Sequence, residues 1–198
     1  MARLPDLIEF GQQHGLKIGT IADLIQYRSA TESLVKRIGE REVQTAFGAF
    51  RMIVFRDTPS GSPHIALVRG EFSPQDEVLV RVHEPLSVLD LLEIDRGGHA
   101  WSVHRALQAI AARDAGVLVM LNCAQEAMRL FAQFEAALAG APATKPPRAA
   151  RMDLRTYGVG AQILRDLGVG RMRLLSAPRR MPSMTGYDLQ VVGFESQP

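Results

Sequence analysis

The sequence contains a single cysteine, Cys123, in 198 residues, and this scarcity excludes two classes of protein. An intrachain disulfide needs two cysteines, and a zinc cage built mainly of thiolates needs several. Long apolar runs are missing as well, since none approaches the ~20 residues that cross a bilayer. The first residues, MARLPDLIEF, lack the basic-then-apolar order of a signal peptide. We therefore expect a cytoplasmic protein without a membrane partner.

A charge excess of either sign is also lacking. The 23 basic residues nearly balance the 21 acidic ones, so the net charge is +2 and gives no reason to expect a nucleic-acid partner. Hydrophobic residues make up 46% and charged residues 22%, which is ordinary for a globular protein. The length allows one substantial core and an appendage.

The first half of the sequence predicts two helices followed by a sheet. Helical spacing of apolar residues indicates helices over 5–14 and 20–37, the second opened by Thr20 with Asp23 three residues later. Three apolar segments then predict strands: 45–57, 63–71 and 78–84. The loop TPSGSP suits a hairpin between the first two strands. An antiparallel opening sheet follows from this order.

In the second half, predicted helices and strands alternate. The expected elements are a helix over 101–113, a buried strand over 116–121, a helix over 126–140, a linker over 141–150, a helix from 153, and strands over 171–177 and 187–194. An antiparallel sheet followed by alternating helices and strands predicts a mixed α/β (α+β) fold.

Two blocks carry a family resemblance. VRVHE (80–84) and DLRTYGVGAQILRDLGVGRMRLLSAP followed by GYDLQVV (153–192) together resemble GTP cyclohydrolase II, a riboflavin-pathway enzyme that opens the imidazole ring of GTP with zinc. The resemblance covers residues 40–192. It implies the fold of that family and a homodimer.

A second resemblance lies at the start of the chain. MARLPDLIEFGQQHGLKIGTIADLIQYR resembles the C-terminal end of 3,4-dihydroxy-2-butanone 4-phosphate synthase, which many bacteria fuse in front of the cyclohydrolase. We therefore divide the chain into 1–38, the synthase tail with a connecting helix, and 39–198, the cyclohydrolase II-like domain. A synthase domain is expected upstream, and synthase activity is not expected from this chain alone.

The resemblance fails at the family's zinc ligands, which are three cysteines. Aligned from His83, the chain offers Leu86, Gly97 and His99 at these positions. Leucine and glycine side chains cannot bind a metal, so we expect no zinc and no other metal cofactor. His83, His99 and His104 have no spacing typical of a zinc motif. Cys123 ends an apolar strand, which favours a buried, inert thiol.

A second loss follows the strand over 116–121. The family has a glycine- and arginine-rich run there that contacts phosphates, followed by a helix with a tyrosine. This chain has NCAQEAMRLFAQFEAALAG, without those glycines and without a tyrosine. Glu126 and Arg129 echo the lost pair, but an ordinary amphipathic helix explains them better.

Other family residues are retained. Asp153 and Arg155 match the proposed proton acceptor and nucleophile of the family. The alternative is structural: Asp153 caps the helix, and Arg155 forms an ion pair with it or with a neighbour. Ser176 and Arg180 match a phosphate-binding loop. With Arg81 and His83 they define a candidate nucleotide or phosphate site, for which a solvated basic loop is the alternative.

Three functions remain open. The leading hypothesis is a degenerate cyclohydrolase II-like domain, inactive on GTP, that supports or regulates a fused synthase. The alternative is an active hydrolase of GTP or a related nucleotide with an altered site. The third hypothesis is a nucleotide-sensing module that binds nucleotide or phosphate weakly.

Overall fold

A computed structural model of the protein describes residues 3–21, 23–24, 27–28, 32–85, 100–123, 154–178 and 184–196, with only the backbone described at Leu154, Arg155 and Thr185. The helices and strands of this part are α1 (Leu4–His14), β1 (Val35–Thr45), β2 (Gly48–Asp57), β3 (Pro63–Arg69), β4 (Glu77–His83), α4 (Val103–Ala111), β5 (Gly116–Met120), α6 (Leu154–Asp166), β6 (Arg171–Leu175), the 3-10 turn η1 (Thr185–Tyr187) and β7 (Gln190–Glu195). None of the described helices is long and apolar enough to span a membrane.

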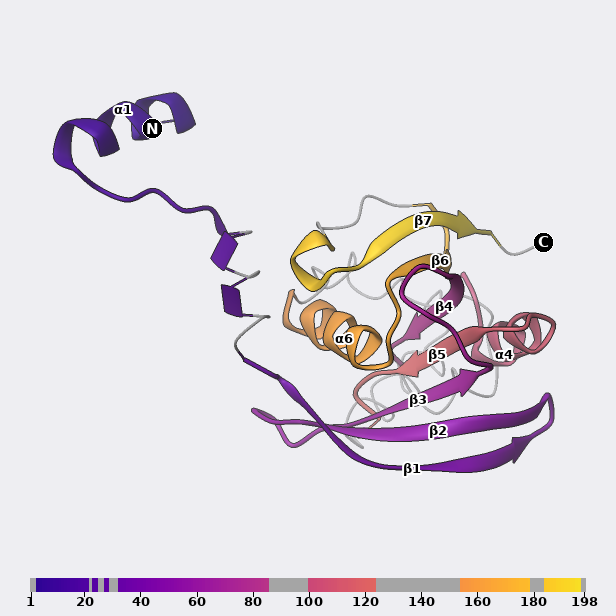
Figure 1. Ribbon diagram of the computed structural model, residues 1–198. Helices are drawn as coiled ribbons and strands as arrows, with labels where there is room; N and C mark the ends of the chain where they lie inside the picture. Colours follow the sequence, from indigo (N-terminus) through magenta and orange to yellow (C-terminus); the bar gives the residue numbers. More distant parts are fainter. Residues whose placement is uncertain are drawn as a thin grey trace, which may run out of the picture.

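The strands form one sheet in the order β1-β2-β3-β5-β4-β6-β7 (Figure 1). Pairing is antiparallel from β1 to β5 and parallel from β5 through β4 and β6 to β7. The predicted mixed α/β fold is confirmed, but the sheet is mixed within itself. In particular, β4 was expected in the antiparallel part, and it lies instead between two parallel neighbours, β5 and β6.

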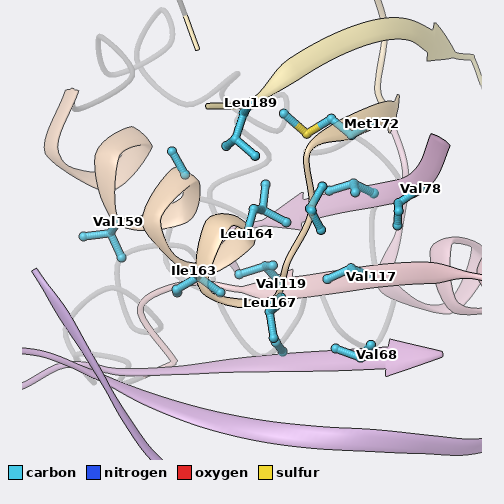
Figure 2. Close-up of a cluster of buried hydrophobic side chains, with 14 of the residues drawn as sticks. Val68, Val78, Val117, Val119, Val159, Ile163, Leu164, Leu167, Met172 and Leu189 are labelled. Carbon is cyan, nitrogen blue, oxygen red and sulfur yellow. The ribbon is translucent and has the colours of Figure 1, made fainter. Parts of the chain in front are cut away.

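The two sheet faces are covered by different helices because side chains alternate along a strand. Val117 and Val119 of β5 join the core beneath α6, whereas Leu118 joins a second cluster beneath α4. Figure 2 shows the first cluster, in which α6 directs Ile163, Leu164 and Leu167 toward the strands. The arrangement is a sheet between helices, with α6 and α4 on opposite faces.

The N-terminal half of α6 contains glycines that would weaken an isolated helix. At Gly158 a Cβ atom would lie 2.9 Å from the hydroxyl oxygen of Tyr187. A Cβ at Gly160 would lie 3.5 Å from Leu121 and Val82. The absence of a side chain at Gly158 therefore lets η1 pack directly on the helix.

The helix predicted over 20–37 is too long, because β1 already begins at Val35. The sequence VKRIGEREVQT is rich in residues that favour helices, but it pairs with β2 as an edge strand, and residues 36–42 are exposed on both of its faces. This run of exposed residues removes the alternation that marks a strand. The β2–β3 hairpin around TPSGSP is confirmed. The predicted helix over 126–140 and the linker over 141–150 lie outside the described residues.

Candidate functional site at the carboxyl edge of the parallel strands

The polar side chains of interest gather where β4, β5 and β6 end. Arg81 and His83 close β4, Asn122 follows β5, and Ser176 follows β6. The parallel pairing of these strands brings their carboxyl ends to one edge of the sheet. Open parallel sheets bind ligands at this edge. The structure thus brings together three of the predicted site residues.

Arg81 is turned into the protein at this edge and is 6% exposed. Its Nη1 donates to the carbonyl oxygen of Leu175 at 2.9 Å, and its Nη2 donates to that of Trp101 at 2.8 Å. Because Leu175 ends β6, the guanidinium joins two strand ends to the chain before α4. In this position Arg81 acts as a structural tie, and nucleotide binding by it stays a prediction.

His83 and Ser176 are also buried. The Nδ1 atom of His83 lies 3.3 Å from Nη2 of Arg81. Since arginine only donates, His83 accepts through this nitrogen and carries its ring proton on Nε2 when neutral. The hydroxyl of Ser176 donates to the carbonyl oxygen of Ala177 at 3.2 Å. Both side chains therefore lie inside the protein, beneath the surface at this edge of the sheet.

The other predicted residues are only partly placed. Arg155 lies in the first turn of α6, with its backbone alone described. Asp153, Arg180 and the three positions aligned with the family's cysteines (Leu86, Gly97 and His99) lie outside the described residues. The roles proposed for them remain predictions.

Sequence reasoning missed a linked set at the same edge: His64, Asn122 and Glu84. The backbone N–H of Asn122 donates to Nδ1 of His64 at 2.9 Å, and its Nδ2 donates to Oε1 of Glu84 at 2.7 Å. Asn122 has φ 50, in the left-handed region that asparagine tolerates better than most residues. The sequence signals were a histidine inside the apolar run PHIALV and an asparagine directly after a buried strand.

Burial lowers the pKa of His64, against the opposing effect of the carboxylates of Asp57 and Glu84. The ring is therefore held neutral, with Nδ1 as the acceptor and the proton on Nε2. Its Nε2 is buried and has no hydrogen-bond partner within the described part of the chain. His64 thus anchors the chain that leaves β5.

Cys123 is half-buried rather than fully buried. Burial raises the pKa of its thiol, partly offset by a hydrogen bond from the backbone of Ile65, and the thiol donates to the carbonyl oxygen of Met120 at 3.5 Å. A protonated thiol is a poor metal ligand. Within the described ranges, no three metal-ligating side chains lie close enough to hold an ion. The chain's donors do not fit a three-thiolate zinc centre.

A hollow of about 230 Å³ lies at the opposite edge, around the beginnings of β4 and β5. Its charged lining consists of Glu77, Asp114, Arg113 and Arg173. Arg173 donates to Glu77 at 2.6 Å, so these opposite charges already compensate each other. We assign no ligand to it.

A mixed sheet between helices, with buried polar groups at the carboxyl edge of its parallel strands, makes this an α/β protein. The family model described as GTP cyclohydrolase II matches residues 36–196. The chain belongs to the GTP cyclohydrolase II family.

Relatives match the chain along nearly its whole length. A 3,4-dihydroxy-2-butanone 4-phosphate synthase of Neisseria meningitidis serogroup B is 43% identical over 198 residues, which is 98% of this chain and 52% of the relative. The riboflavin biosynthesis protein RibBA of Aquifex aeolicus is 37% identical over 204 residues, covering 97% of the chain and 49% of that protein.

Among solved structures, that of RibBX, a two-domain 3,4-dihydroxy-2-butanone 4-phosphate synthase from A. baumannii, superposes with a TM-score of 0.53 at 34% identity. The superposition covers 99% of the present chain and 49% of the RibBX chain. The present chain therefore spans about half the length of the relatives it matches.

Proposed function

We propose that this chain is the cyclohydrolase II-like half of a two-domain riboflavin biosynthesis protein, and that it supports a 3,4-dihydroxy-2-butanone 4-phosphate synthase domain instead of opening GTP. The relatives at 42–43% identity are named for the synthase, as is one at 36%, and those named RibBA are 37–38% identical. These names do not favour the alternative of an active GTP hydrolase.

One observation carries the loss of ring opening: the chain has one cysteine, Cys123, and it is at none of the three positions aligned with the family's cysteines. Catalytic zinc needs three protein ligands and an open position to lower the pKa of bound water. The chain has Leu86 and Gly97 at two of the three aligned ligand positions, and neither side chain has a donor atom. Without that metal, nothing in the proposed site generates hydroxide near neutral pH.

The N-terminal segment supports the two-domain part of the proposal. The family match begins at residue 36, while the relatives also match the residues before it. Between residues 3 and 28 the chain exposes a set of large apolar side chains: Leu4, Leu7, Ile8, Phe10, Leu16, Ile18, Ile21, Leu24 and Tyr27. We propose that the part of residues 1–38 that precedes β1 is the tail of a synthase domain, which covers these side chains in the longer protein.

The deciding experiment measures zinc and GTP turnover on the purified chain. We expect substoichiometric zinc after dialysis against a chelator, and no formation of formate and pyrophosphate from GTP. The triple variant Leu86→Cys, Gly97→Cys and His99→Cys should stay inactive, since the phosphate-contacting run is also missing, and Leu86→Cys alone serves as its control. Tightly held stoichiometric zinc, or turnover by the unmodified chain, would overturn the proposal.

Support of the synthase is tested in the longer protein. Synthase activity and its thermal inactivation are measured with and without residues 36–196. We expect faster inactivation of the shortened protein, and unchanged behaviour would show that the domain has no supporting role.

We also propose a homodimer, with roughly 2,000 Å² or more buried if it is obligate. Light scattering tests this, and a monomer at all concentrations would refute it.

The remaining proposal is a weak anion site near Arg155 and Arg180. Its dissociation constant should lie in the high-micromolar to millimolar range, which corresponds to a binding free energy of ~4 to 6 kcal/mol. Calorimetry with GTP at low salt should detect it, and Arg180→Ala should weaken it several-fold.

A further inference from the structure

The junction between the N-terminal segment and the sheet is held by a helix that lies far away in sequence. Gln162 of α6 is 8% exposed and uses both ends of its amide at this junction. Its Nε2 donates to the carbonyl oxygen of Glu32 at 3.0 Å, and its Oε1 accepts from the backbone N–H of Leu34 at 2.7 Å. One side chain therefore satisfies the backbone on both sides of residue 33, as a neighbouring strand would.

A second contact from the same helix lies one turn further on. Nε and Nη2 of Arg37 donate to Oδ2 of Asp166 at 3.1 and 2.7 Å. Residues four apart share a helix face, so Gln162 and Asp166 reach the chain from the same side. They contact it before and after Val35, where β1 begins. Two separated contacts resist rotation of the junction, whereas one contact alone would allow it.

The contact at Glu32 also reaches the segment that precedes it. The backbone N–H of Glu32 donates to the carbonyl oxygen of Arg28 at 2.7 Å, a hydrogen bond with helical i to i+4 spacing. Gln162 binds the carbonyl oxygen of the same residue, so both backbone groups of Glu32 are satisfied.

On the other side, the junction is part of the body. The carbonyl oxygen of Leu34 accepts from the N–H of Thr58 at 2.8 Å, and the Leu34 side chain packs against the core beneath α6. Gln162 thus joins Leu34, which is packed on the body, to Glu32 two residues before it.

From this geometry we infer that Gln162 is a positioning residue, which fixes the backbone of residues 32 and 34, directly before β1, on α6. The attachment of the N-terminal segment to the sheet therefore depends on a side chain that lies 128 residues after Leu34 in the sequence. Only the identity of what this attachment would hold, a synthase domain, rests on the proposed function.

The test uses Gln162→Met, which keeps a side chain of similar length and removes both hydrogen bonds. Gln108→Met is the matched control, since Gln108 is exposed on α4. Amide hydrogen exchange at Leu34 reports the bond to Oε1. We expect about tenfold faster exchange in Gln162→Met and no change in Gln108→Met. Fluorescence of Trp101, the one tryptophan of the sequence and buried in the body, checks that the core remains folded.

The attachment is also measured with a dye on Glu32→Cys in a Cys123→Ser background, by time-resolved anisotropy at nanomolar concentration. Because Gln162 holds the backbone of residue 32, the dye should rotate with the whole protein, and Gln162→Met should add a fast local rotation. Asp166→Asn, which weakens only the exposed second contact, should add a smaller one and serves if Gln162→Met does not fold. Fast rotation already present in the unmodified protein, or an unchanged profile in both variants, would overturn the inference. Neither readout involves a synthase, so failure of the proposed function would appear separately, in the turnover measurements.

Discussion

The N-terminal segment and the body place similar residues in opposite environments. Ile163 of α6 is 0% exposed and lies in the core, whereas Ile21 of the segment is 72% exposed. Both belong to stretches with helical spacing of apolar residues, the pattern that indicates a buried face. In the body the sheet covers that face. In the segment, which stands apart from the sheet in Figure 1, the described part of the chain leaves it uncovered.

The hydrogen bonds differ in the same way. Those described within the segment are local, as in the capping box where Thr20 N–H donates to Asp23 at 2.9 Å and Asp23 N–H donates to Thr20 at 3.1 Å. In the body, strands far apart in sequence are paired. Arg81 binds the carbonyl oxygens of Trp101 and Leu175, which lie 20 and 94 positions further along the chain. Local bonds give the segment its helical shape, but short helices without burial are marginal in water. The segment therefore behaves as part of another folding unit.

The largest effect expected from this comparison comes from a matched pair of truncations. Ile163→Ala removes buried methyl groups and leaves a cavity, so it should lower the free energy of unfolding by about 2–5 kcal/mol. Ile21→Ala removes the same atoms from an exposed position and should change it by less than about 0.5 kcal/mol. Urea unfolding followed by Trp101 fluorescence measures both. Equal effects would show that the segment unfolds as part of the body.

A smaller effect is expected at the notch between α6 and η1. Gly158→Ala places a methyl group 2.9 Å from the Tyr187 hydroxyl oxygen, and this overpacking should cost about 1–3 kcal/mol. Adding Tyr187→Phe removes that oxygen and leaves the next ring atom at 3.8 Å, an ordinary contact. Alanine also favours a helix over glycine by about 1 kcal/mol, so the double variant should regain at least the wild-type stability. A double variant as unstable as Gly158→Ala would disprove the packing role.

Gly158 also shows which parts of the fold can be predicted from the sequence and which cannot. Apolar runs such as GVLVML were enough to predict the central strands. The partner of Gly158 was not predictable, because Tyr187 lies 29 residues away and meets the helix only through the packing of η1. The start of the edge strand β1 was missed because residues 36–42 are all exposed and show no alternating burial.

The candidate site was predictable only as a group of residues. Family motifs grouped Arg81, His83 and Ser176, and the structure places these three at one edge of the sheet, while ligand binding by them stays a prediction. Nothing in the sequence indicated that the Arg81 guanidinium faces the carbonyl oxygens of Leu175 and Trp101, because this depends on strand order. His64 was missed since a histidine in an apolar run reads as an ordinary strand residue. Its contact with Asn122 exists only because β3 begins at the edge where β5 ends.

The buried residue His64 predicts that the stability of the body depends on pH. In the unfolded chain His64 titrates near its ordinary pKa of 6.5, and in the folded protein burial lowers that pKa. As the pH falls from about 7 toward 5, the unfolded state binds a proton that the folded state does not, so stability decreases. His64→Asn keeps an acceptor for the N–H of Asn122 but cannot titrate, and should make this decrease shallower. A profile equally steep in His64→Asn and wild type would assign the effect elsewhere.

The smallest effect is expected at the ion pair that ends the segment. Arg28 Nη2 lies 2.6 Å from Glu32 Oε2, and this short distance suggests a strong interaction. Both side chains are about half exposed, however, at 60% and 49%, so water screens the attraction, and ordering two long side chains opposes it. Glu32→Gln also retains the backbone carbonyl that Gln162 binds. We therefore expect no measurable change in the urea midpoint of the body, at low or high salt. A decrease as large as that of Gly158→Ala would mean that the segment contributes to the cooperative unfolding of the sheet, and the contrast between the two regions would no longer hold.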